Sequence, residues 1–290
     1  MAPDPPLPLS QVVRNQSRPY TDPAGRELIV IEEEPALEIA ARRGCGLGHI
    51  YVAALSQDIW PVRYVRHRDI FSRAEQLTLA NARVAVIGAG GLGGTVLLLL
   101  ARLGVGFLVV ADGDVFDETN LNRQALSDTA NIGLSKADEA DKKVCHINPA
   151  VEVSAFRQKI TATNADSILS EVHAVVDALD NIPDRITIGS AAQRLGLPLV
   201  HGALAGFDGQ VMTIFPQDPG LERIYGDPPP VDSHPNRPEA VLGVPAPTAS
   251  IVATIQAMEV VKILLGRGRL IRNRLLHIDL EGGRFEGFSF

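Results

Sequence analysis

The segment that most constrains this chain is Gly88-Ala-Gly-Gly-Leu-Gly-Gly94, which lies between an apolar strand predicted over 84–87 and a helix predicted over 92–103. Glycines at this junction let the backbone approach a phosphate, and the first turn of the helix offers unpaired N–H groups. We therefore expect Gly88, Gly90, Gly91 and Gly93 to line a nucleotide-binding turn. The alternative, that these glycines only permit close helix–strand packing, fits a strand–turn–helix context less well.

The same alternation of strand and helix continues along the chain. Further strands are predicted over 107–111, 151–156, 174–177, 198–201, 210–215 and 275–280, and helices over 136–147, 166–172, 183–195 and 248–265. Strands that are apolar along nearly their whole length indicate a parallel sheet covered on both faces. We expect an α/β fold with a Rossmann-like doubly wound, mostly parallel sheet, and antiparallel strands at its C-terminal end. Thr248 is predicted to cap the last helix, and the strand over 275–280 to close the chain.

Two domains are expected. Residues 1–80 form a small N-terminal extension, which we divide into a mobile proline-rich arm (1–25), a small α/β segment and an arginine-bearing helix. Residues 81–290 form the main domain, in which 216–247 holds nine prolines and is predicted to be a long irregular loop on the substrate side. Two helices around the glycines near 44–48 could suggest a DNA-binding motif, but the acidic run 32–34 argues against it.

Composition excludes several classes of function. With 27 basic and 34 acidic residues the net charge of the 290-residue chain is −7, so it lacks the excess of positive charge that is typical of nucleic-acid-binding proteins. Cys45 and Cys145 are too few for a disulfide framework or a four-thiolate zinc site. We find no secretory signal and no membrane-spanning run of about 20 apolar residues. A cytoplasmic protein is expected.

The chemistry is predicted from residues after the glycine turn. Asp112 follows the second strand of the unit, where a carboxylate can accept hydrogen bonds from a ribose. Asn120, Arg123 and Lys136 come next and indicate more phosphate charge than a dinucleotide carries, hence a triphosphate. Such a ligand needs a divalent ion, for which Asp180, beyond the strand over 174–177, is the candidate.

These residues also carry a resemblance. The motifs GAGGLGG, DGDVFDETNLNRQ, Ile132-Gly-Leu-Ser-Lys136, Asp180-Asn181 with Arg185, and SIVATIQAMEVVKILLG occur in an order that resembles the ThiF/HesA/MoeB family, the bacterial relatives of ubiquitin-activating enzymes. The resemblance covers about residues 63–268. It implies that Asp112 binds ribose, that Asn120, Arg123 and Lys136 hold the triphosphate, and that Asp180 binds Mg²⁺. Asp114, Gln124 and Asn181 complete the implied nucleotide site.

The resemblance further implies an activity. Members of this family use ATP and Mg²⁺ to adenylate the C-terminal glycine carboxylate of a ubiquitin-like sulfur carrier of the ThiS/MoaD type, releasing pyrophosphate, in thiamine or molybdenum/tungsten cofactor synthesis. The segment Arg63-Tyr-Val-Arg66 resembles one whose second arginine enters the neighbouring subunit's site, which implies a homodimer with Arg66 acting in trans. A separate desulfurase or rhodanese-type sulfur donor is implied as well.

Two departures and three alternatives accompany this prediction. The chain lacks the paired Cys-x-x-Cys motifs of zinc-bearing relatives, so no zinc is expected, and 216–247 offers no conjugating thiol. The alternatives are adenylation of a peptide or another carboxylate, with 26–80 as a substrate clamp; an NAD-dependent oxidoreductase; and a non-catalytic nucleotide-binding scaffold. The histidines His146, His201 and His234 are expected to be structural or solvated.

Overall fold

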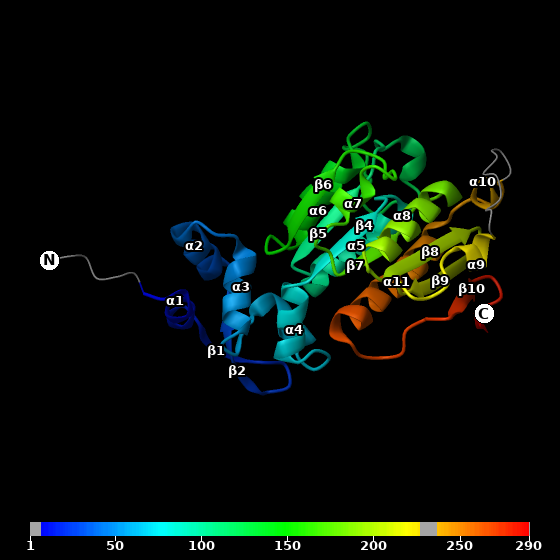
Figure 1. Ribbon diagram of the computed structural model, residues 1–290. Coiled ribbons are helices and arrows are strands. Elements are labelled where there is room, and N and C mark those ends of the chain that lie inside the picture. Colours follow the sequence, from blue (N-terminus) through cyan, green and yellow to red (C-terminus); the bar gives the residue numbers. More distant parts are fainter. Residues whose placement is uncertain (1–6, 227–236, 290) are drawn as a thin grey trace.

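The computed structural model describes residues 7–226 and 237–289 and is built around one large sheet (Figure 1). Its eight strands lie in the order β11-β10-β9-β8-β7-β4-β5-β6. From β6 to β8 neighbouring strands are parallel, whereas β9, β10 and β11 join antiparallel, so the predicted fold class is confirmed. The strands are β4 Arg83–Ile87, β5 Phe107–Ala111, β6 Glu152–Phe156, β7 Ala174–Asp177, β8 Leu199–Ala205, β9 Asp208–Ile214, β10 Arg274–Asp279 and β11 Arg284–Ser289.

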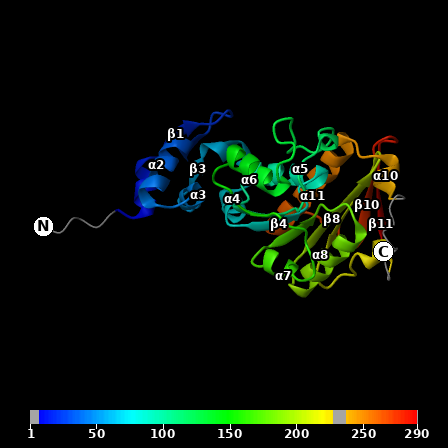
Figure 2. The ribbon, with the colours of Figure 1, turned by 90° about the horizontal axis from the view of Figure 1, so that it is seen from above.

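Helices cover both faces of this sheet (Figure 2). On one side lie α5 (Gly91–Leu103), α6 (Lys136–Ile147) and α11 (Ala246–Leu265); on the other lie α7 (Ala165–Ile168) and α8 (Ile182–Arg194). Alternate residues of β4 show why the strand is apolar from Val84 to Ile87: Val84 and Val86 belong to the first core, and Ala85 and Ile87 to the second. A strand buried on both faces has no polar alternation, as predicted.

The N-terminal residues form a separate small unit at one end of the molecule (Figure 1). A three-stranded sheet and three helices enclose a core that runs from Val13 to Val65. The elements are α1 Leu9–Asn15, β1 Arg18–Thr21, β2 Glu27–Ile31, α2 Glu33–Arg43, α3 Leu47–Leu55 and β3 Ile59–Pro61. The prediction of a mobile arm over 1–25 is therefore wrong for α1 and β1, because Val13 is fully buried and β1 pairs with β2; residues 1–6 lie outside the described part.

A short connection joins the two units. It consists of the 3-10 helix η1 (Val62–His67), which holds the predicted arginine segment, and α4 (Arg73–Ala80). Phe71 and Leu79 already pack into the core of the large sheet, whereas Val65 packs into the small one. Leu77 and Ala80 pack against the small core, so α4 contacts both cores and the two units meet along this helix.

The C-terminal third contains elements that the sequence pattern did not predict. The strand β11 follows β10, so the expectation that the strand over 275–280 closes the chain is wrong; β11 is exposed along its length and gives no burial pattern. Thr248 does not cap α11, which begins after Pro245; its hydroxyl instead donates a hydrogen bond to the Gly206 carbonyl. The predicted loop 216–247 contains α9 (Glu222–Tyr225) and α10 (Pro238–Leu242), and its residues 227–236 lie outside the described part.

One helix, α11, is long and apolar enough to cross a membrane by length and composition, which the sequence analysis overlooked. Half of its apolar stretch is buried inside the fold. Val252, Ala253, Val260 and Val261 of this helix belong to the core that also holds α5 and the central strands. We therefore describe α11 as a core helix of the sheet.

The glycine turn after β4 requires two of its glycines for packing. Gly88 has φ +92°, and a Cβ there would lie 2.6 Å from the Ala178 carbonyl oxygen. A Cβ on Gly93, in the first turn of α5, would lie 1.8 Å from the Gly88 carbonyl oxygen. The helix can approach the turn this closely only because position 93 has no side chain.

We predict that Gly93→Ala lowers the free energy of unfolding by about 1–3 kcal/mol, because the added methyl group must displace the turn backbone. Gly91→Ala is the matched control on the same helix, since its Cβ would lie at ordinary van der Waals distances from its neighbours, 3.6 Å from the Ala249 Cβ and 3.7 Å from the Arg123 carbonyl oxygen. Urea titration followed by circular dichroism measures both variants. Equal unfolding midpoints for Gly93→Ala and the unsubstituted protein would show that this contact does not constrain the helix.

Candidate active site

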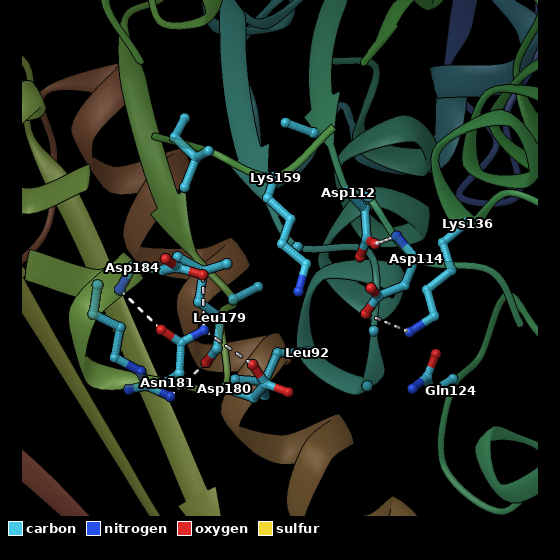
Figure 3. A pocket seen from close by; sticks show the side chains of 18 of the residues that line it. Leu92, Asp112, Asp114, Gln124, Lys136, Lys159, Leu179, Asp180, Asn181 and Asp184 are labelled. Atoms are coloured by element: carbon cyan, nitrogen blue, oxygen red, sulfur yellow. Dashed lines mark hydrogen bonds and ion pairs between the residues drawn. The ribbon is translucent and has the colours of Figure 1, made fainter. Parts of the chain in front are cut away.

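A cavity of about 200 Å³ opens at the carboxyl edge of the sheet, where β4, β5, β6 and β7 end beside the first turn of α5 (Figure 3). Residues far apart in the sequence meet there because the carboxyl ends of parallel strands share one edge. Ten of the thirteen predicted site residues line it: Gly88, Gly90, Gly91, Asp112, Asp114, Arg123, Gln124, Lys136, Asp180 and Asn181.

Asp112 connects the second strand to the glycine turn. One carboxylate oxygen accepts a hydrogen bond from the Ala89 N–H (2.7 Å), and the other accepts one from the Asp114 N–H (2.8 Å). Burial raises the pKa of the Asp112 carboxyl above its ordinary value, and these two backbone hydrogen bonds act in the opposite direction. Asp112 therefore holds the glycine turn in place, and it also lines the cavity, where a ribose could reach it.

Two predicted cations face the cavity from the segment after Asp112. Lys136 begins α6 and is buried, with its Nζ 3.6 Å from an Asp114 carboxylate oxygen and its ammonium over the Phe116 ring. It is thus not a solvated surface lysine. The Arg123 guanidinium donates to the Thr119 carbonyl (2.8 Å) and to the Asn122 side chain (2.9 Å). These neutral acceptors fix the orientation of the guanidinium and leave its positive charge uncompensated.

Asp180 and Asn181 lie beyond β7 on the other side of the cavity (Figure 3). Asn181 caps α8: its side chain accepts from the Asp184 N–H (2.9 Å) and donates to the Asp184 carboxylate (2.8 Å). Asp180 is exposed and accepts only a long bond (3.4 Å) from Asn181. In the described residues no three His, Cys, Asp or Glu side chains cluster to hold a metal. A single free carboxylate suits an ion that takes its other ligands from water and substrate phosphates.

Gln124 gives a direct test of whether a polar ligand fits. Its side chain is buried and lines the cavity, yet its Oε1 has no hydrogen-bond partner within the described chain. A buried polar atom without a partner is costly unless a ligand or water supplies one. The donors of the cavity, which are the unpaired backbone N–H groups at α5 and two cations, fit a nucleotide polyphosphate with a divalent ion. The Gln124 Oε1 is an acceptor and suits a hydroxyl or amino group of the nucleotide or a metal-bound water.

Three predicted residues do not line the cavity. Gly93 packs against Gly88 instead, as described above. Asn120 is buried and accepts a hydrogen bond from the Asp117 N–H (3.2 Å), so it shapes the turn η2 (Glu118–Asn120) that aims Arg123. Arg66 lies exposed on η1, outside the cavity.

The sequence analysis missed four charged residues that do line it: Lys159, Asp184, Arg185 and Glu239. Lys159 lies three residues past the end of β6. Because ligands bind outside the carboxyl ends of parallel strands, a residue just after this predicted strand could have been identified as a candidate. Arg185 was noted only as part of the Asp180-Asn181 motif. Glu239 comes from α10, whose position no local pattern predicts.

Arg185 belongs to a buried network beneath the cavity. It donates to the Leu179 and Gly202 carbonyls and to the Tyr225 hydroxyl (2.8 Å). Asp177 is fully buried, and although burial opposes its ionisation, Arg185 and His201 hold its pKa below the ordinary range. The bond from Arg185 to the carbonyl of Leu179 positions the backbone next to Asp180. His201, expected to be structural or solvated, is fully buried and structural.

The proton positions in this network follow from its charges. Because Asp177 is ionised and only accepts, the His201 Nδ1 at 2.7 Å carries the proton that it donates. The His201 Nε2 then accepts weak bonds from the Tyr225 hydroxyl (3.4 Å) and the Gln210 amide (3.5 Å). Burial lowers the pKa of His201 below 6.5, only partly offset by Asp177, so the imidazole is neutral in the folded protein.

This neutral imidazole predicts a pH dependence of stability. Below pH 6.5 the unfolded chain binds a proton at His201 that the folded protein does not, so the free energy of unfolding falls as the pH is lowered. We expect this group to contribute a slope of at most about 1.4 kcal/mol per pH unit below pH 6.5, until the pH reaches the lowered pKa of the folded protein. His201→Gln should flatten that slope, as measured by urea unfolding at several pH values.

The control for this experiment is His146→Gln, which removes an exposed imidazole and should leave the slope unchanged. Asp112, whose raised pKa contributes with the opposite sign, is common to all three proteins and cancels in the comparison. Parallel pH profiles for His201→Gln and the unsubstituted protein would contradict a neutral, buried His201.

Comparisons with known proteins agree with this geometry. The chain is 36% identical over 226 residues to the SAMP-activating enzyme E1 of Haloferax volcanii, covering 77% of this chain and 83% of that one. It is 39% identical over 210 residues to a sulfur carrier protein adenylyltransferase of Thermus thermophilus, covering 70% and 77% of the two chains. Among solved structures it shares the fold of Escherichia coli MccB in complex with MccA-N7isoASN, with a TM-score of 0.68, 20% identity and coverage of 79% and 71%.

A second solved structure, that of PaaA, superimposes with a TM-score of 0.65 at 20% identity and covers 95% of this chain and 98% of that one. The shared fold therefore extends to the N-terminal unit. The sequence model of the ThiF family matches residues 64–289, which include every element that lines the cavity. With this match and relatives above 30% identity over most of both chains, the chain belongs to the ThiF family.

Proposed function

We propose that this protein is an adenylyltransferase that uses ATP to activate the C-terminal carboxylate of a ubiquitin-like sulfur-carrier protein. The observation that carries the proposal is the convergence of Asp112, Lys136, Arg123 and Asp180 on one cavity beside the glycine turn. The relatives described above are named for activating SAMP and for adenylating a sulfur carrier, which supports the same class of substrate. A NAD-dependent oxidoreductase would have no use for the cations beyond the glycine turn.

The reaction follows from the charges of the site. A carboxylate oxygen of the carrier forms a bond to the α-phosphorus of ATP, and the bond from that phosphorus to the bridging oxygen breaks. Pyrophosphate leaves with the electron pair, so no proton has to move, because the attacking carboxylate is already ionised at neutral pH. Negative charge builds up on the departing oxygen, and Arg123 and Lys136 stabilise it more strongly in the transition state than in the ground state.

The remaining residues orient the substrates. Asp112, held by the glycine turn and the Asp114 N–H, is placed to accept the ribose hydroxyls. The first turn of α5 presents N–H groups to the phosphates, and the unpartnered Oε1 of Gln124 can accept a hydrogen bond from a nucleotide hydroxyl or amino group. Asp180 would hold Mg²⁺, which when bound offsets the charge of the phosphates during the transfer.

Several partners are part of the proposal. A separate desulfurase or rhodanese-type protein supplies the sulfur, and the pathway is thiamine or molybdenum/tungsten cofactor synthesis. The absence of zinc stays a prediction, which metal analysis of the purified protein tests. Both cysteines are free thiols, which is compatible with a cytoplasmic location.

We predict that removing Arg123 or Asp180 reduces the reaction rate strongly and leaves the fold intact. Arg123→Ala and Asp180→Ala should each cost about 2–4 kcal/mol of transition-state stabilisation, which is roughly 30- to 1,000-fold in rate. The measurement is carrier-dependent exchange of labelled pyrophosphate into ATP, together with detection of the acyl-adenylate by mass. Asp166→Ala, which removes an exposed carboxylate paired with Arg194 away from the cavity, is the control.

Each outcome of this experiment separates the candidates. Near-normal exchange in both variants would contradict the proposed site. Exchange that requires a peptide or small carboxylate, and not a carrier with its terminal glycine, would favour the alternative substrate class. Thermal protection by NAD, and not by ATP with Mg²⁺, would favour the oxidoreductase.

Arg66 is proposed to act from the second subunit of a homodimer. It is exposed and lies outside the cavity of its own chain. Val115, Leu121, Ile132 and Leu134 are exposed apolar side chains on the segment between β5 and α6, which also holds Arg123, and they suit burial against another copy. A closed two-fold dimer would place each Arg66 at an equivalent position near its neighbour.

Mixing two impaired variants tests this arrangement. Arg66→Ala and Asp180→Ala should each have only a few per cent of the normal rate or less when alone, roughly as estimated above for Asp180→Ala, but a mixed dimer contains one site with its own Asp180 and the partner's Arg66. Random reassociation makes half the dimers mixed, with one intact site of two, so the exchange rate should recover to about a quarter of normal. Arg66 acting within its own chain would give no recovery at all.

A further inference from the structure

Lys159 lines the cavity, and the proposed reaction has given it no role. Four basic side chains line the cavity: Arg123, Lys136, Lys159 and Arg185. Arg123 and Arg185 are bound to backbone carbonyls, and Lys136 is paired with Asp114. Within residues 7–226 and 237–289 the Lys159 ammonium has no hydrogen-bond or ion-pair partner. It is therefore the cation whose charge is most available to a ligand.

The position of Lys159 is set by its neighbours. A Cβ on Gly113 would lie 2.9 Å from the Lys159 Cγ and 3.0 Å from its backbone N, so the lysine stem passes directly against Gly113, the residue after Asp112. Figure 3 shows the side chain running into the cavity, with its ammonium between the side formed by Asp112 and Asp114 and the side formed by Leu179 and Asn181. In that view Lys136 approaches from the far side of Asp112 and Asp114.

This position corresponds to one part of the nucleotide. If the ribose binds at Asp112 and the carboxylate arrives beside Asp180, the phosphorus that joins them lies between these two side chains. We propose that Lys159 is a catalytic residue that contacts the α-phosphate. The inference rests on the proposed function. Arg123 and Lys136 contact the β- and γ-phosphates, which leave as pyrophosphate. Lys159 contacts the α-phosphate, which stays in the acyl-adenylate.

The assignment gives Lys159 a distinct role in the reaction sequence. The oxygens of the α-phosphate carry negative charge in ATP, in the transition state and in the acyl-adenylate. Contacts to pyrophosphate are lost when it departs, but a contact to the α-phosphate persists. A contact that is equally strong in all three states strengthens binding without lowering the barrier from bound ATP. Lys159 therefore helps to bind ATP and retains the acyl-adenylate until the next acceptor arrives.

The test compares AMP with adenosine, which differ only in this phosphate. Affinities are measured by displacement of a fluorescent ATP analogue from the full-length protein. AMP should bind more tightly than adenosine, and Lys159→Met should reduce that preference about tenfold while adenosine affinity is unchanged. Lys159→Arg should restore part of the preference, because it keeps the charge. In the exchange assay Lys159→Met should also release more acyl-adenylate into solution than the unsubstituted protein.

Two controls separate a contact from a general charge effect. Arg157→Met removes a positive charge two residues away, where Arg157 pairs with Asp138 outside the cavity, and should leave the AMP preference unchanged. Lys136→Met should reduce the preference for ATP over AMP, and not that for AMP over adenosine. Unfolding midpoints confirm that each variant folds, as expected for Lys159 because its side chain is exposed.

The outcomes distinguish the two levels of the proposal. An unchanged AMP preference in Lys159→Met, with normal exchange in the unsubstituted protein, would overturn the role of Lys159 and leave the adenylyltransferase intact. An equal loss of adenosine and AMP binding would overturn it as well, because it would assign Lys159 to the base or ribose. Absence of both exchange and ATP binding in the unsubstituted protein would overturn the proposed function and this inference with it.

Discussion

The contact between α5 and the turn after β4 is the constraint on which the site depends. Because position 93 carries no side chain, the helix begins against the Gly88 carbonyl, and its free N–H groups face the edge of the sheet. Asp112 then ties the turn to the neighbouring strand through the Ala89 N–H. A nucleotide bound here would meet a backbone that is already in place, so little ordering entropy would remain to be lost on binding.

A second layer of interactions stabilises the acidic side of the cavity. Arg185, Asp177, His201 and Tyr225 are linked in one largely buried network, in which Arg185 bonds the Leu179 carbonyl beside Asp180. Tyr225 belongs to α9, in the segment that we expected to be irregular, so the network also connects this segment to the sheet. Buried charges are costly unless they are paired and hydrogen-bonded, and this network satisfies its members at the place where the proposed metal carboxylate must be held.

The local pattern predicted the central elements well and the periphery poorly, for a physical reason. Strands buried on both faces, such as β4 and β7, are continuously apolar and end at glycine or aspartate, so their residues identify them. The edge strand β11 is exposed throughout and is defined only by its pairing with β10. The helix α1 and strand β1 follow a proline-rich start and owe their order to packing in the small core. Asn120 illustrates the same limit, because its residue type fits both phosphate binding and the turn that it forms.

The residues alone were sufficient to assign the fold class, the family resemblance and the set of residues that lie near the nucleotide turn, because motif order along the chain dictates which residues follow which strand. Tertiary structure alone decided which of these share the cavity and what each one contacts. It buried His201 beside Asp177, separated Arg66 from its own cavity and brought Lys159 alongside Gly113. These contacts depend on the order of strands across the sheet and on side-chain packing, and the spacing of residues along the chain determines neither of them.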